Sequence, residues 1–148
     1  MGIVALPSVR FSRTFPRPEP LKYPKNLKTI GDHIRKRRMD KGLSQSKLGQ
    51  IFMVSKDCVT NWENGRNTPQ IGFYPRIISF LGYNPFLGDK STLGNAIFAY
   101  RCEKGISAKS LGAAIGIGGC TVLAIEQNRC IPQKDTLRKI GAIIQYKL

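Results

Sequence analysis

The stretch KDCVTNWEN, residues 56–64, carries side chains suited to hydrogen bonding with a macromolecular partner. Its polar residues are Lys56, Asp57, Thr60 and Asn61. Val59 and Trp62 are three residues apart, so a helix here would turn both toward one side. Lysine donates hydrogen bonds, aspartate accepts them, and threonine and asparagine do both. The pattern predicts a helix with one recognition face and one packing face.

The sequence lacks the residue groups that catalysis or metal binding needs. A single histidine, His33, and nine scattered Asp and Glu residues form no nucleophile, acid–base pair or metal cluster that spacing can identify. The four cysteines contain no C-x-x-C pair, and three of them are distant from the histidine. They are Cys58, Cys102, Cys120 and Cys130. We therefore expect no enzyme activity, metal or cofactor, and we favour free thiols over a disulfide or redox switch.

The charge of the chain indicates a polyanionic partner. Its 148 residues include 24 Lys and Arg against nine Asp and Glu, for a formal net charge of +15. Nucleic acid and an anionic membrane surface both carry the opposite charge. However, no apolar run approaches the ~18 residues of a membrane span, and no basic region precedes the short apolar stretch at the start. We expect a cytoplasmic, nucleoid-associated protein without membrane contact.

An internal repeat organises the chain. Residues 29–83 align without a gap to residues 92–146, an offset of 63, with sixteen identical pairs. Identical pairs include Gly31 and Gly94, Arg38 and Arg101, Leu48 and Leu111, Val59 and Val122, and Glu63 and Glu126. Such a repeat predicts two similar units in tandem. We expect a flexible basic Pro-rich arm over 1–28, a unit over 29–84, a linker over 85–91 and a second unit over 92–148.

Each unit is expected to hold four helices, which makes the fold class all-α. In the first unit, Ile30 and Ile34 share a face of a helix that stops at Gly42. Ser44 is suited to cap a second helix and Ser55 a third.

The second helix carries Leu48, Ile51 and Phe52 at helical spacing. Gly65 is expected to end the third helix. Residues 71–82 then form a fourth helix, with Pro75 in its first turn.

LSQSKLGQIFMVSKDCVTNWENGRNTP resembles the helix-turn-helix of the phage repressor and Cro-like family, also called the xenobiotic-response-element type. The matching features are Ser-Gln at the start of helix two, Leu48, the Val-Ser turn, Val59, and Trp-Glu-Asn-Gly-Arg before Pro69. The resemblance covers residues 29–82. It implies specific binding of double-stranded DNA, regulation of transcription, and a homodimer on a palindromic site.

In repressors of this family, the first two positions of helix three and the sixth touch base edges, which implies Lys56, Asp57 and Asn61 here. We add Thr60 from the same polar face. Lysine suits guanine O6 and N7, and asparagine suits adenine, at ~1–3 kcal/mol of discrimination for each good contact. Asp57 either accepts from cytosine N4 or orients Lys56.

Four further positions are expected to contact phosphates. Gln45 matches a position that the family uses either for phosphate or for bracing the reading helix. The loop after helix three adds Asn64, Arg66 and Asn67, which would position the protein without specifying sequence.

Similar proteins also pair an Arg of helix one with the Glu of helix three. That implies structural ion pairs between Arg38 and Glu63 and between Arg101 and Glu126. A direct phosphate contact is the alternative for Arg38.

The second unit lacks the residues assigned to recognition. Ala108, Gly119, Cys120 and Ala124 stand where the first unit has Gln45, Lys56, Asp57 and Asn61. Residues 28–69 hold nine Lys and Arg and four Asp and Glu (+5), whereas residues 92–132 hold four and two (+2). The second unit could therefore serve packing or self-association, with phosphate contacts from Lys109 and Arg129, or bind a second half-site.

Two alternatives remain open at this point. Residues 1–28 contain six Lys and Arg and one Glu, so this arm could enter the minor groove, follow phosphates, or serve no particular role. The alternative function is a protein-interaction module, such as an antitoxin or a mobile-element accessory protein, with DNA binding secondary or lost. RNA binding is less favoured, because no aromatic stacking surface is evident.

Overall fold

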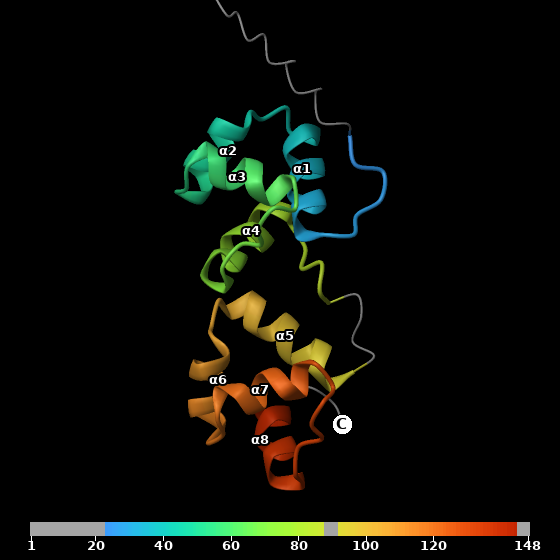
Figure 1. The fold of residues 1–148 in the computed structure, drawn as a ribbon, viewed down its shortest axis with the longest axis vertical. Coiled ribbons are helices and arrows are strands. Elements are labelled where there is room, and N and C mark those ends of the chain that lie inside the picture. Colours follow the sequence, from blue (N-terminus) through green and yellow to red (C-terminus); the bar gives the residue numbers. More distant parts are fainter. Residues whose placement is uncertain (1–22, 88–91, 145–148) are drawn as a thin grey trace, which may run out of the picture.

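A computed structural model describes residues 23–87 and 92–144, and these form helices without any strand (Figure 1). The elements are α1 (Ile30–Asp40), α2 (Gln45–Phe52), α3 (Lys56–Glu63), the 3-10 turn η1 (Ile71–Phe73), α4 (Tyr74–Leu81), α5 (Leu93–Lys104), α6 (Ala108–Ile115), α7 (Gly119–Glu126) and α8 (Lys134–Ile144). The all-α prediction is confirmed. The predicted arm up to residue 22 and residues 88–91 of the predicted linker lie outside the described residues.

The first three helices begin at side-chain caps. Ser44 Oγ accepts a hydrogen bond from Lys47 N, and Ser55 Oγ accepts one from Cys58 N. Thr29 caps α1 in a reciprocal arrangement with Asp32, whose carboxylate accepts from the Thr29 backbone. The predicted caps at Ser44 and Ser55 are confirmed, as is Pro75 in the first turn of α4.

The first core fills the space between α1, α2, α3 and α4. Its fully buried side chains include Ile34, Leu48, Phe52, Val59 and Ile77. Trp62 lies against Phe52, with 6.3 Å between ring centroids. Ile51 differs from the expectation: it is 45% exposed, because Leu48 and Phe52, four residues apart, already occupy the inward stripe of α2.

A second core lies in residues 92–144. Its buried residues are Ile97, Leu111, Ile115, Val122, Ile125 and Ile140. Each stands 63 positions after a buried residue of the first core. Helices α6 and α7 also begin 63 positions after α2 and α3.

The two cores meet where α4 packs against α5 (Figure 1). Cys102 of α5 is fully buried and belongs to the first core, and Phe98 packs against that core. Phe86, within the predicted linker, lies between Tyr74 and Phe98, at ring-centroid distances of 5.6 and 5.1 Å. The halves therefore share an apolar junction.

Among the described residues, no single helix is long and apolar enough to cross a bilayer. Helices α6 and α7 together have the length and composition of a span. However, they meet at 106°, and Leu111, Ile115 and Val122 point into the second core.

Close packing of α1 on α3 depends on Gly31. A Cβ placed there would come within 1.9 Å of the Trp62 carbonyl oxygen. The matching Gly94 of α5 faces α7 in the same way, with Glu126 O at 2.6 Å. Both positions require a residue without a side chain.

Gly31→Ala should therefore destabilise the protein by ~1–3 kcal/mol, because the backbone of α1 or α3 must move to admit the methyl group. Gly72→Ala is the matched control, since a Cβ there meets nothing within 4 Å. Thermal unfolding by circular dichroism compares the two variants. Equal melting temperatures would contradict the close approach of α1 to α3.

Candidate nucleic-acid interface

Helix α3 separates a packed face from a polar face. Val59, Trp62 and Glu63 are buried against the first unit. Lys56 and Asp57 are exposed in the first turn, and Thr60 and Asn61 are half-buried. Because the apolar face is held by the core, the polar face has a fixed orientation.

A carboxylate at the end of α3 joins three helices. Glu63 Oε1 accepts a hydrogen bond from Arg38 Nε at 2.6 Å, and Oε2 accepts from Arg38 Nη2 at 2.9 Å. Gln45 Nε2 of α2 donates to the same Oε2 at 2.9 Å. Arg38 Nη1 donates to the Leu43 carbonyl, also at 2.9 Å. This network holds α3 against α1 and α2.

Gln45 also contacts the polar face of α3. Its Oε1 lies 3.1 Å from the Thr60 hydroxyl, which is also 2.9 Å from the Lys56 carbonyl oxygen. The single hydroxyl hydrogen can serve one acceptor at a time. Gln45 thus braces the helix, while one of its two amide hydrogens has no contact in this network.

A hollow of about 450 Å³ opens where the N-termini of α2 and α3 approach the end of α1. Arg38, Met39, Ser44, Gln45, Ser46 and Lys56 line it. Lys56 is an exposed cation of this lining, whereas the charge of Arg38 is already paired with Glu63. Helix N-termini also present backbone N–H groups to an anion. The hollow has the chemistry of an anion site at the edge of the polar face.

The loop after α3 presents polar groups to solvent. Asn64, Arg66 and Asn67 are exposed. Gly65 has a φ of +66°, which L side chains rarely adopt, and this conformation lets Arg66 N donate to the Asn61 carbonyl at 2.9 Å. The chain therefore turns away just after the C-terminal end of α3, where Arg66 is exposed.

The corresponding network in the second half is incomplete. Arg101 Nε lies 3.3 Å from Glu126 Oε1, but neither atom has a hydrogen-bond partner. Burial raises the pKa of Glu126, and the nearby Arg101 opposes that shift only in part. Ala108, in place of Gln45, cannot donate to the carboxylate.

The face of α7 also differs from that of α3. Gly118 caps α7 without a side-chain hydrogen bond, and Gly119 and Cys120 replace the charged first turn. Leu123, at the position of Thr60, is 43% exposed. This face offers few hydrogen-bonding groups.

The described residues show no assembly of metal ligands, since no three His, Cys, Asp or Glu side chains gather there. All four cysteines are free. Burial raises the pKa of Cys102 to about 12, so this thiol stays protonated and unreactive.

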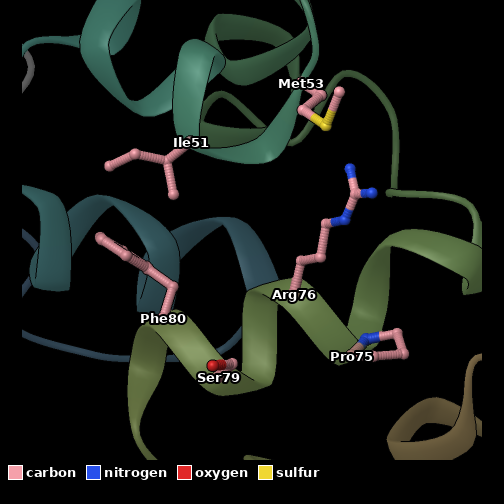
Figure 2. Close-up of a pocket in the computed structure, with 6 residues that line it drawn as sticks. All are labelled: Ile51, Met53, Pro75, Arg76, Ser79 and Phe80. Atoms are coloured by element: carbon pink, nitrogen blue, oxygen red, sulfur yellow. The ribbon is translucent and has the colours of Figure 1, made fainter.

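A second hollow, of about 550 Å³, lies between α2 and α4 (Figure 2). Ile51, Met53, Pro75, Arg76, Ser79 and Phe80 line it. Arg76 extends across it toward Met53 and donates to the Phe52 carbonyl at 3.2 Å. That bond satisfies a carbonyl at the end of α2, which indicates a role in joining α2 to α4.

Sequence reasoning placed the polar face and both ion pairs but missed how they connect. Bracing of the reading helix was one of the two roles expected for Gln45, but its partners Glu63 and Thr60 were not predicted. One signal was present: Gln45 is replaced by alanine in the half that also lacks the polar face.

Comparison with known families matches residues 34–87 to the helix-turn-helix family of the Cro and C1 type. The matched region contains all of α2, α3 and α4 and most of α1. No curated protein and no solved structure matches the chain.

Glu63→Ala should lower stability by ~3–5 kcal/mol, because it leaves the largely buried guanidinium of Arg38 unpaired. The melting temperature should fall on the order of 10 °C. Glu126→Ala should cost less, since the carboxylate that it removes has an unsatisfied oxygen. Differential scanning calorimetry tests both, and an unchanged melt for Glu63→Ala would refute the structural role.

Proposed function

We propose that this protein binds double-stranded DNA sequence-specifically through α3 and regulates transcription. The observation that carries the proposal is the division of α3, which has a buried apolar face and a polar face braced by Gln45 and Glu63. A helix held in this way can present its N-terminal side chains to the major groove. The helix-turn-helix match over residues 34–87 supports this function over a protein-interaction module.

Lys56 and Asn61 are the proposed sequence-reading residues. Lys56 is exposed in the first turn and can donate to guanine O6 or N7, whereas Asn61 can pair with adenine N6 and N7. Asp57, also exposed, would accept from cytosine N4 or orient Lys56. Thr60 is partly engaged by Gln45, so its methyl group is the part best suited to a base contact.

Phosphate contacts would position α3 on the duplex. Asn64, Arg66 and Asn67 form an exposed polar loop at one end of the helix, and Gln45 stands beside the hollow at the other. Donors at both ends could hold the helix across the groove. Gln45 would use its remaining amide hydrogen for phosphate while continuing to brace Glu63.

Residues 92–144 are, on this proposal, a degenerate second helix-turn-helix. The support is the 63-residue spacing of the helices and buried positions, together with equivalent close approaches at Gly31 and Gly94. Its proposed role is to pack and self-associate. Two chains joined in this way would present two α3 helices to a palindromic site.

Selection of bound duplexes from random DNA should enrich a defined sequence. Lys56→Ala and Asn61→Ala should each weaken binding to it by ~1–3 kcal/mol and relax preference at one base pair. Arg66→Ala should weaken all sequences similarly and reduce the salt slope by about 1. Arg138→Ala is the control for general loss of positive charge, because the Arg138 side chain is 82% exposed on α8 and has no proposed contact with DNA. Binding that falls with salt but enriches no sequence would overturn specific readout.

The role of the second half is tested with surface variants of the full chain. A deletion of this half would also remove Cys102 and Phe98, which contribute to the first core. Leu123→Glu and Ile131→Glu alter side chains that are 43% and 91% exposed. Both should reduce self-association in sedimentation equilibrium while leaving the melting temperature near that of wild type. A monomeric wild-type chain whose footprint covers two half-sites would favour direct DNA binding by α7 instead.

A further inference from the structure

Apolar side chains from the end of α2 and from α4 meet at the hollow shown in Figure 2. Ile51, near the end of α2, is 45% exposed, and Met53, just after the helix, is 75% exposed. Phe80 of α4 lies across the hollow from Ile51 and is half-buried. Single exposed apolar side chains are ordinary on a protein surface, but several at one hollow are typical of a surface that binds a partner.

Met53 occupies a backbone position that is better suited to glycine. Its φ of +59° lies in the left-handed region, which costs an L side chain steric energy. The equivalent position in the second half is Gly116, which also ends a helix with a positive φ. Ile51 corresponds to Ala114 in the same way. Large apolar side chains are therefore not needed to form this turn, yet the first half carries two of them in contact with water.

Positive charge borders the hollow. Arg76 is exposed and extends across it, and its bond to the carbonyl at the end of α2 uses one of five N–H donors. Lys41 Nζ lies 5.6 Å from the centroid of the Phe80 ring, so a second cation stands over the apolar wall. Both cations can meet a partner that contacts Phe80.

The two helices that form the hollow contain no carboxylate. Together, α2 and α4 include Lys47 and Arg76 but no Asp or Glu. Asp40, the neighbour of Lys41, accepts a hydrogen bond from the Tyr23 hydroxyl at 2.7 Å and does not line the hollow. The hollow is thus an apolar surface with a positively charged border.

This combination distinguishes between the possible occupants. DNA has the required negative charge, but interfaces with DNA are more polar than those between proteins, and here phosphates would meet exposed apolar side chains. A second copy of the chain would bring its own net charge of +15 to a positive border. A protein segment with apolar and acidic side chains matches both the walls and the border. Grooves between helices commonly take such a segment as an amphipathic helix.

We propose that the hollow between α2 and α4 binds an acidic amphipathic helix of a protein partner. Apolar side chains of that helix would pack on Ile51, Met53 and Phe80, and its carboxylates would pair with Arg76 and Lys41. No residue that lines the hollow is among those proposed to contact DNA. The surface therefore adds a protein partner to the proposed function and does not depend on it.

Two variants remove the apolar contacts without disturbing the core. Met53→Gly should melt at the wild-type temperature or above, because glycine adopts the positive φ without steric cost. Ile51→Ala shortens a side chain that is 45% exposed, and Leu87→Ala is its control, since Leu87 is 40% exposed and does not line the hollow.

A third variant, Lys41→Gln, removes a border charge. Its control is Lys134→Gln, because Lys134 is also exposed but lies on α8 in the second half. Both variants should melt within a few degrees of wild type.

The probe is a labelled synthetic peptide of about 16 residues, with leucine on one helical face and glutamate on the other. A scrambled peptide of the same composition lacks the apolar face, and a third peptide has lysine in place of glutamate. Fluorescence anisotropy measures binding to the full-length chain. Changes in amide NMR signals locate the bound peptide.

The acidic amphipathic peptide should bind wild type more tightly than either control peptide and shift the amide signals of residues 51–53 and 75–80. Met53→Gly and Ile51→Ala should each weaken binding about fivefold or more, because each removes apolar area that the peptide buries. Lys41→Gln should weaken it about two- to fourfold, and less at high salt. Leu87→Ala and Lys134→Gln should each change it by less than about twofold.

Equal binding of the scrambled peptide or of the lysine peptide would overturn the proposal, as would wild-type affinity in both Met53→Gly and Ile51→Ala. Self-association of wild type that is lost in Met53→Gly would assign the hollow to a second copy and also overturn it. Lys56→Ala should bind the peptide within about twofold of wild type. A failure of DNA binding is therefore distinguishable from a failure of this proposal.

Discussion

The arrangement of the first unit depends on one buried carboxylate. Glu63 lies at the end of α3 away from water, and burial of an unpaired charge would cost several kcal/mol. Arg38 supplies two hydrogen bonds and Gln45 a third, so helices α1, α2 and α3 must meet at this point. Gly31 permits that meeting by removing the side chain between α1 and α3. The orientation of the polar face follows from these constraints and the apolar core beneath it.

The second half shows what happens when one member of such a network is missing. Arg101 and Glu126 remain near each other, yet alanine at position 108 leaves the carboxylate short of a donor, and burial raises its pKa. The apolar positions and the close approach at Gly94 are still present. The helices of this half thus keep their packing without a glutamine that donates to the carboxylate, whereas a braced polar face is confined to the first. This contrast is consistent with separate requirements for folding and for recognition.

At the junction between the halves, residues of the second half contribute to the core of the first. Cys102 and Phe98 of α5 contribute to the first core, and Phe86 connects α4 to α5 through aromatic contacts. The first unit is therefore stabilised by residues that follow it in the sequence. At its other side, residues 23–29 attach to α1 through short polar contacts. The helix that supports α3 thus also holds residues 23–29, which precede it in the sequence.

The sequence by itself determined features that depend on neighbours along the chain. Caps at Ser44 and Ser55, the turn at Pro75, the two faces of α3 and the repeated Arg and Glu positions all follow from local periodicity or from the repeat. Tertiary structure decided the rest: the bond from Gln45 to Glu63, the exposure of Ile51, the place of Cys102 in the first core and the bond from Tyr23 to Asp40. The two hydrogen bonds and the core position of Cys102 join residues that are distant in sequence. The exposure of Ile51 depends on which side chains of α2 occupy its buried face. Their outcome is set by distances and packing, which a local pattern does not contain.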